Sequence, residues 1–172
     1  MKLIHPYESS IGGSSVGSDS RFGAGQTFKA VDGEFYYIST VEDFSHLYKI
    51  SRGGTVSGPL TAGSSCDSFD VAGGHIASME FHGLHIAELF VDGEQVTHMN
   101  DWLTDEYDVQ TPEAFTFTAS DGYEIHGWVL KPAGFEEGKS YPGILNIHGG
   151  PRTVYSDVYY HEMQMWANRG YF

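Results

Sequence analysis

The stretch ILNIHGGPR, residues 144–152, holds the residue types whose spacing most clearly suggests chemistry. Its apolar start, Ile144–Ile147, predicts a buried strand that leads directly into His148-Gly149-Gly150-Pro151. Glycines let the backbone approach a ligand closely and adopt unusual dihedral angles. Fixed N–H dipoles in such a turn stabilise the negative charge that develops during acyl transfer. The turn is therefore a candidate oxyanion hole; the alternative is a tight strand-exit turn around a buried His148.

An oxyanion hole serves a nucleophile, which in hydrolases with this kind of turn is the serine of a downstream G-x-S-x-G motif. Nothing after Pro151 fits that motif. The one literal match, GSSVG at residues 13–17, places Ser15 far upstream, with no strong strand before it and no helix after it. The triad order of serine, acid, histidine argues against His148 as the base, so we interpret it as structural. We expect no catalytic residue in this chain.

Two further patterns resemble sites but lack the required chemistry. Residues 133–140, AGFEEGKS, resemble the motif of a phosphate-binding loop. Two glutamates, however, stand where the phosphates would bind, and Tyr141-Pro142 begins a strand where the motif requires a helix. We interpret this segment as a charged surface loop. Four histidines follow no metal-ligand spacing, and strand alternation would scatter them over two faces. We expect neither a metal nor a cofactor; these histidines are His75, His82, His85 and His98.

The charge balance restricts the class of partner. The chain carries 23 acidic and 9 basic residues, a formal net charge of -14, which argues against nucleic acid or an anionic membrane as a ligand. We interpret the carboxylates as a solvated surface.

The single cysteine, Cys66, has no positive neighbour to activate it and no partner for an internal disulfide. With no secretory signal and no long apolar run, the sequence predicts a soluble, cytoplasmic protein.

Two segments 41 residues apart resemble each other: FKAVDGEFYYIS from Phe28 and FDVAGGHIASME from Phe69. Each copy alternates short strands with glycine turns, and a period of about 40 to 45 residues is typical of a β-propeller blade. Two blades cannot close a propeller, which needs about four or more. The aligned pairs are Gly33/Gly74, Phe35/Ile76 and Ile38/Met79, then Leu47/Leu89 after one extra residue, with Thr61 and Thr97 in corresponding places further on.

The segments on either side of the repeat differ from it in composition and in predicted secondary structure. The first 25 residues are rich in Gly and Ser and predict a loop or a poorly anchored strand. After an acidic, turn-rich connection over 100–112, Asp121-Gly122 predicts a hairpin between two alternating runs. Residues 158–170 then predict a helix capped by Gly170, with Tyr159, Met163, Trp166 and Ala167 on one face. A hairpin, a strand and a helix in this order are typical of the start of an α/β domain.

These residues resemble the opening of the catalytic domain in the prolyl oligopeptidase family of serine peptidases, particularly its acylaminoacyl-peptidase and dipeptidyl-peptidase-like members. The likeness is sharp over 113–172 and weaker, through the repeat, over 28–100. Its motifs here are Ser120-Asp121-Gly122, Ile125-His126-Gly127-Trp128, Pro132, Tyr141-Pro142, Ile147-His148-Gly149-Gly150-Pro151 and Asn168-Arg169-Gly170-Tyr171.

The resemblance implies a mixed fold: partial β-propeller blades over 1–110, then the first hairpin, strand and helix of an α/β-hydrolase domain over 111–172. It implies that Gly150 donates its N–H to the oxyanion and that Arg152 faces the substrate side; the residues alone favour a solvated side chain for Arg152. We expect a fragment of a serine exopeptidase or oligopeptidase acting on short peptides, itself inactive. Unpaired strand edges should favour homo-oligomers. Two alternatives stay open: an esterase fragment, because HGG turns serve those too, and a non-catalytic β-rich binding module.

Overall fold

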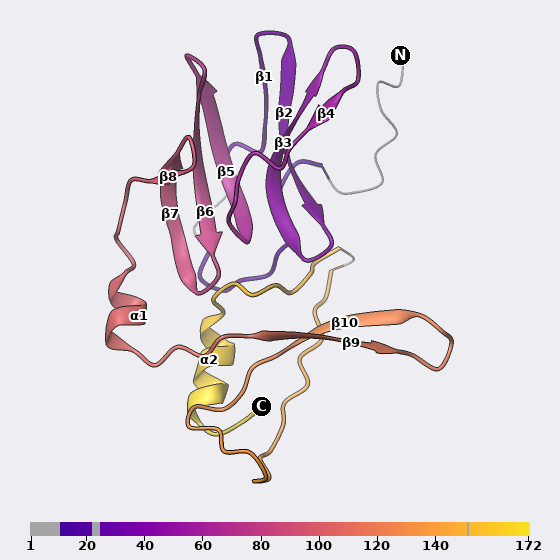
Figure 1. Cartoon of the computed structure of the whole chain (residues 1–172), viewed down its shortest axis with the longest axis vertical. Helices are drawn as coiled ribbons and strands as arrows, with labels where there is room; N and C mark the ends of the chain where they lie inside the picture. The colour runs from indigo at the N-terminus through magenta and orange to yellow at the C-terminus, as the bar shows by residue number, and fades with distance from the viewer. Residues whose placement is uncertain (1–10, 22–24, 151) are drawn as a thin grey trace.

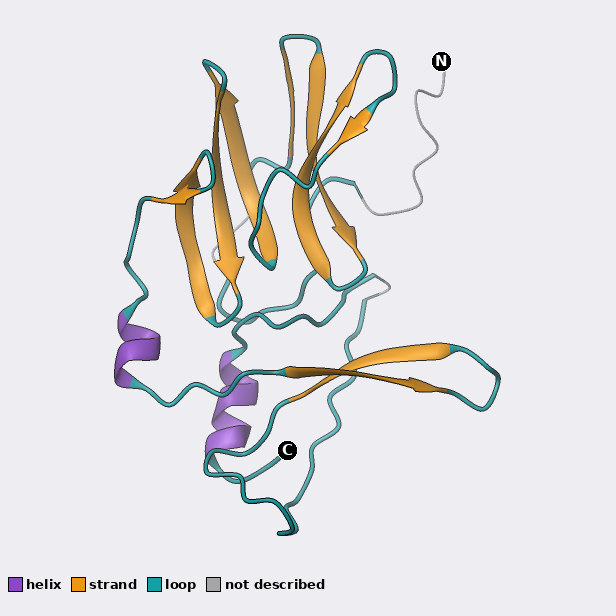
Figure 2. Ribbon diagram, in the orientation of Figure 1, coloured by secondary structure: helices purple, strands orange, loops and turns teal. Residues whose placement is uncertain are grey.

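The computed structural model describes residues 11–21, 25–150 and 152–172. This part of the chain is mostly β-sheet with two short helices (Figures 1 and 2). The strands of one large sheet come first, and a separate hairpin and the second helix follow below it in Figure 1. Neither helix in the described residues has the length and apolar character needed to cross a bilayer.

The large sheet consists of two four-stranded units, and each unit is an antiparallel meander. The 41-residue repeat is confirmed, since β2 and β6 have the same length and begin at Glu34 and His75. The strands of the first unit are β1 (Phe28–Val31), β2 (Glu34–Val41), β3 (Phe44–Ser51) and β4 (Val56–Ser57). Those of the second are β5 (Ser65–Ala72), β6 (His75–His82), β7 (His85–Val91) and β8 (Glu94–Gln95).

The one-residue insertion that the aligned repeats require is a β-bulge. The register between β6 and β7 shifts where Glu80 pairs with Glu88 and His82 pairs with His85, so β7 carries one more residue than β6. The corresponding stretch of the first unit, Ser39–Val41 against Phe44–His46, is regular. A bulge adds a residue without breaking the sheet, so the two units keep the same order of strands.

The two units share a core. They touch through a parallel bridge between Ser45 and Ser65, and five buried residues from both units form one hydrophobic cluster. Cys66 belongs to this cluster; burial, with the nearby Glu80 carboxylate, raises the pKa of its thiol well above the ordinary value. A raised pKa keeps the thiol protonated and unreactive. The cluster is made of Ile38, Leu47, Cys66, Phe69 and Val71.

The connection and the C-terminal elements follow the predicted order with one addition. A short helix, α1 (Trp102–Glu106), forms within the acidic connection, where only turns were predicted. The hairpin is confirmed as β9 (Glu113–Thr118) and β10 (Glu124–Val129), and Gly122 in its turn has a φ of 91°. The one predicted helix is confirmed as α2 (His161–Asn168), which begins three residues later than predicted. Gly170 ends it with a φ of 87° and donates its N–H to the carbonyl of Ala167.

One prediction about local structure is wrong. Ile144–Ile147 is not a buried strand: the segment is in no sheet, and Leu145 and Ile147 are 85% and 77% exposed. Its backbone contact is one hydrogen bond from Ile144 N to Phe172 O, too little to form a ladder. The described part of the glycine- and serine-rich start, residues 11–21 and 25, is a loop as predicted, but it is anchored at Val16. Val16 is 1% exposed and pairs with Val154, because tertiary contacts replace the missing apolar periodicity.

Candidate functional site

The glycine turn after residue 147 depends on a backbone conformation that favours glycine. Gly150 has a φ of 135°, in the region that L side chains rarely adopt. A Cβ there would lie 3.0 Å from the backbone nitrogens of Arg152 and Thr153 and from Thr153 Oγ1. Pro151 lies outside the described residues. The close approach of Thr153 and the positive φ together explain why glycine occupies position 150.

The N–H groups of this turn point to no acceptor among the residues that the structure describes. Neither Gly149 nor Gly150 donates a hydrogen bond there, and both are exposed. His148 is exposed rather than buried, with Nδ1 3.2 Å from the carbonyl oxygen of Gly149 and its ring edge-on to Tyr155 at 5.5 Å. Arg152 is exposed beside the turn. Backbone donors without an internal acceptor can bind an external anion.

Tyr155 links the turn to the hairpin. Its hydroxyl donates to Asn146 Oδ1 at 3.0 Å, and its carbonyl accepts a hydrogen bond from Trp128 Nε1 at 3.0 Å. Burial raises the pKa of Tyr155, so the hydroxyl stays a proton donor at neutral pH. Behind these residues lies an apolar cavity of about 390 Å³ whose lining includes Leu145 and Trp166. Asn146, Tyr155 and Trp128 are thus joined by hydrogen bonds and line this cavity, and Asn146 lies two residues before His148.

Residues 14–19 tie this region to the large sheet. Gly17 N donates to Val154 O at 2.8 Å, and Val154 N donates to Ser15 O at 2.9 Å, which makes a short parallel bridge four residues after Gly150. Asp19 then caps α2: its carboxylate oxygens accept from the N–H groups of His161 and Glu162 at 2.7 and 2.9 Å. A carboxylate at a helix N-terminus satisfies free donors and complements the helix dipole.

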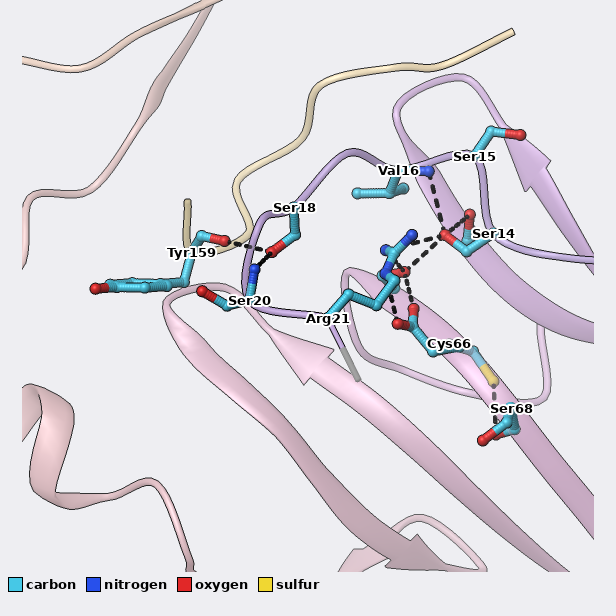
Figure 3. A network of polar contacts seen from close by, with 12 residues as sticks. Ser14, Ser15, Val16, Ser18, Ser20, Arg21, Cys66, Ser68 and Tyr159 are labelled. Carbon is cyan, nitrogen blue, oxygen red and sulfur yellow. Dashed lines mark hydrogen bonds and ion pairs between the residues drawn. The ribbon is translucent and has the colours of Figure 1, made fainter. Parts of the chain in front are cut away.

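The same segment is fastened to both repeat units by a polar network, shown in Figure 3. The hydroxyl of Ser14 lies 2.8 Å from the hydroxyls of Ser45 and Ser65, the two residues that bridge the units. Arg21 forms an ion pair with Asp67 at 2.6 Å and also donates to Ser14 and Ser65. Burial raises the pKa of Asp67, and the Arg21 charge opposes that rise. Position 14 thus joins both units to the segment that holds α2.

Three other patterns from the sequence analysis lie upstream of the glycine turn: Ser15, the loop of residues 133–140 and the four histidines. Ser15 lies in an extended segment, and its own N–H donates to Thr40 Oγ1 at 2.8 Å. The loop of residues 133–140 is on the surface, with Lys139 paired to Glu136 at 2.6 Å. Three of the four histidines contact a different carboxylate each, instead of converging with one another. These pairs are His75–Asp92 at 2.6 Å, His82–Glu80 at 3.0 Å and His98–Asp101 at 3.0 Å.

The contribution of Asp19 and Val154 to this region could not be read from the sequence. Ser18-Asp19-Ser20 has the composition of a helix cap, but no helix follows it locally. The helix that it caps begins 142 residues later. A capping side chain from a distant segment leaves no local signal, because capping rules assume that cap and helix are adjacent.

Known peptidases are similar to this chain in sequence and in structure. The uncharacterized peptidase YuxL of Bacillus subtilis is 32% identical over 147 residues, 80% of this chain. Dipeptidyl-peptidase 5 of Schizosaccharomyces pombe is 40% identical over 45 residues, 26% of this chain. The structure of Pyrococcus horikoshii acylaminoacyl peptidase superposes with a TM-score of 0.73 at 29% identity over 84% of this chain. No protein-family model matches.

The fold and these relatives define a peptidase-related chain. It belongs to the prolyl oligopeptidase family of serine peptidases. A puromycin hydrolase, with a TM-score of 0.59 at 20% identity, shares the fold. The chain spans 22% of the length of the YuxL peptidase and 23% of that of the acylaminoacyl peptidase.

Proposed function

We propose that this chain is the junction segment of a serine exopeptidase or oligopeptidase that hydrolyses short peptides by acyl transfer. In this proposal residues 1–110 are propeller blades and residues 111–172 open an α/β-hydrolase domain. The two meander units and the similarity to acylaminoacyl peptidase support this division. The nucleophile, its acid and its histidine base lie elsewhere in the parent enzyme, so the 172 residues alone have no peptidase activity.

One observation carries the proposal: Gly150 holds a φ of 135° in an exposed turn whose N–H groups have no acceptor among the described residues. In an acyl transfer the His148-Gly149-Gly150-Pro151 turn would direct an N–H at the tetrahedral oxyanion. Arg152, exposed next to the turn, would face the substrate side. Loss of one oxyanion donor costs on the order of 100- to 1000-fold in kcat, because the contact strengthens in the transition state.

The test replaces Gly150 with alanine in the full-length peptidase that carries this segment. We expect kcat to fall on the order of 100-fold or more while KM changes little. Gly122→Ala is the matched control, since Gly122 also has a positive φ, 91°, but lies in the hairpin turn with open space around it. An unchanged kcat in Gly150→Ala, or an equal loss in Gly122→Ala, would contradict the role of the turn.

A second experiment tests for a nucleophile in the chain itself. The purified protein is treated with a fluorophosphonate serine probe, and its intact mass is compared before and after with the unmodified 19.0 kDa. We expect no label, and the same result for Ser15→Ala. A labelled species at this mass that disappears in Ser15→Ala would make Ser15 a true nucleophile. Such a result would replace the proposal with an enzyme contained in these residues.

We also propose that the isolated chain forms homo-oligomers and works in the cytoplasm. The exposed Ile144, Leu145 and Ile147 leave apolar side chains on one segment that belongs to no sheet, which favours contact with a second copy. The short peptide remains the expected ligand of the parent, because the negative charge disfavours nucleic acid and anionic membranes. The buried, unpaired Cys66 fits a reducing compartment.

A further inference from the structure

Fixed positive charge is missing from a long part of this protein. Between Arg52 and Lys131 the sequence contains no Lys or Arg, yet it contains 13 of the 23 Asp and Glu residues. These 13 carboxylates nearly equal the formal net charge of -14. The stretch covers the second meander unit, α1 and the hairpin. A region with one sign of charge attracts ligands of the opposite sign.

An aromatic groove lies where this acidic stretch meets the C-terminal helix, between α1 and α2, which are neighbours below the sheet in Figure 1. Its volume is about 410 Å³. Trp102 and Tyr107 line one side and Met165 lines the other. Trp102 is 48% exposed and Tyr107 is 60% exposed, and their rings meet edge to face at 6.0 Å. Aromatic rings this exposed present their π faces to a ligand.

One carboxylate lines the aromatic side of the groove, and two more belong to the helix that carries Trp102. Asp105 and Glu106 are exposed on α1, and Asp108 belongs to the lining. None of these three takes part in an ion pair between described residues. Among the lining residues only His161 can become cationic, and its Nδ1 lies 3.2 Å from the hydroxyl of Tyr159. The groove therefore combines aromatic faces with negative charge that has no internal counterion.

We propose that the groove between α1 and α2 is a docking site for a positively charged peptide segment. A guanidinium or ammonium group would lie against the faces of Trp102 and Tyr107, an arrangement that aromatic quadrupoles favour. Asp105, Glu106 and Asp108 would supply the balancing charge, and Met165 would contact the aliphatic part of the ligand side chain. This site is separate from the glycine turn and requires no peptidase activity.

The test measures binding of a short blocked peptide rich in arginine, labelled with a fluorophore, to the 172-residue chain by fluorescence anisotropy. The same peptide with citrulline in place of arginine keeps the shape and removes the charge. We expect the arginine peptide to bind at least tenfold more tightly at about 0.01 M salt. We expect most of that advantage to be lost at about 1 M, where the Debye length falls from about 30 Å to about 3 Å. Equal affinity for both peptides would overturn the proposal.

Two triple variants with the same charge change separate the groove from general attraction. Asp105→Asn, Glu106→Gln and Asp108→Asn together should weaken binding about tenfold, since exposed charge pairs are individually weak. Glu94→Gln, Asp121→Asn and Glu124→Gln remove three exposed carboxylates elsewhere and should change affinity less than twofold. An equal loss in both sets would show that net charge alone attracts the peptide, and would overturn the docking site.

A last variant, Trp102→Leu, keeps an apolar side chain and removes the aromatic face. We expect a three- to fivefold loss of affinity, the effect of one exposed cation–π contact. Circular dichroism and the thermal midpoint identify a variant that has lost its fold. If Trp102→Leu has lost its fold, the comparison of the arginine and citrulline peptides on the unaltered chain still decides whether the positive charge of the peptide is recognised. Unchanged affinity in a folded Trp102→Leu protein would contradict the aromatic contact.

Discussion

The hydroxyl of Thr97 accepts a hydrogen bond from the backbone N–H of Leu89 at 2.9 Å. The first meander unit has the same arrangement, because Leu47 N donates to Thr61 Oγ1 at 3.0 Å. The residue before each threonine also matches: Leu60 N donates to Leu47 O and Val96 N donates to Leu89 O, both at 2.8 Å. The weak sequence repeat thus preserves a specific side-chain contact in both copies.

Loss of this threonine hydroxyl should destabilise the fold. In Thr61→Val the N–H of Leu47, whose residue is fully buried, has no acceptor, and an unsatisfied buried donor costs about 1 to 3 kcal/mol. We expect the free energy of unfolding in urea to fall by about that amount. Thr61→Ser keeps the hydroxyl and should retain most of the stability. A valine variant as stable as the unaltered chain would show that Leu47 N–H does not depend on Thr61.

Glu88 should make stability depend on pH. It is 2% exposed; burial raises the pKa of its carboxyl, but hydrogen bonds from Thr97, Met99 and Asn100 outweigh burial and lower it below 4.5. A depressed carboxyl pKa stabilises the fold above the unfolded value and loses that effect as pH falls through the folded value. Glu88→Gln should therefore be clearly less stable than the unaltered chain at pH 7.

The measurement is urea unfolding of both proteins between neutral and acidic pH. The stability difference between them should shrink as pH falls below about 4.5, because Glu88 then becomes protonated in both the folded and unfolded states. Glu94→Gln is a suitable control, since Glu94 is exposed. A difference that stays constant over this pH range would mean that the Glu88 charge does not contribute.

Asp19 should control the order of α2. Asp19→Ala leaves the N–H groups of His161 and Glu162 without their acceptor and should cost about 1 kcal/mol. Amide hydrogen exchange should become faster in the first turn of α2 and at Val154, whose N–H donates to Ser15 O. Asp19→Asn keeps an acceptor oxygen and should have a smaller effect. Unchanged exchange in Asp19→Ala would contradict the tie between the segments.

The exposed segment before the glycine turn should drive self-association of the isolated chain. Leu145 is 85% exposed, so Leu145→Lys removes apolar surface without creating a cavity. We expect light scattering to give a mass above 19.0 kDa for the unaltered chain and a lower mass for Leu145→Lys. Val96→Lys changes an exposed residue next to β8 and serves as the control. A monomeric unaltered chain at high concentration would count against the prediction.

Much of the local structure was predictable because its causes are local. The spacing between β2 and β6 follows from glycine turns at matching positions, and Asp121-Gly122 specifies the hairpin between β9 and β10. Gly170 ends α2 because its positive φ suits a C-terminal cap. In each case the residues that determine the element lie within it or beside it.

The remaining features depend on residues far apart in the sequence. The α1 helix has no side-chain cap and contains one buried residue, Leu103, so the acidic connection carried little sign of it. The strand predicted at Ile144–Ile147 is missing because the segment finds no neighbouring strand to complete a ladder. The groove between α1 and α2 joins side chains separated by more than fifty positions, and no local pattern reports such a meeting.

The sequence alone determined the repeat, the hairpin, the second helix and the glycine turn, because periodicity and glycine conformations act over a few residues. It also predicted the family, through motifs concentrated after residue 113. Only the tertiary structure decided that Asp19 caps α2, that Val16 pairs with Val154 and that Thr61 and Thr97 satisfy equivalent buried donors. Those contacts form when distant segments are brought together by burial of a shared core, which sequence spacing does not encode.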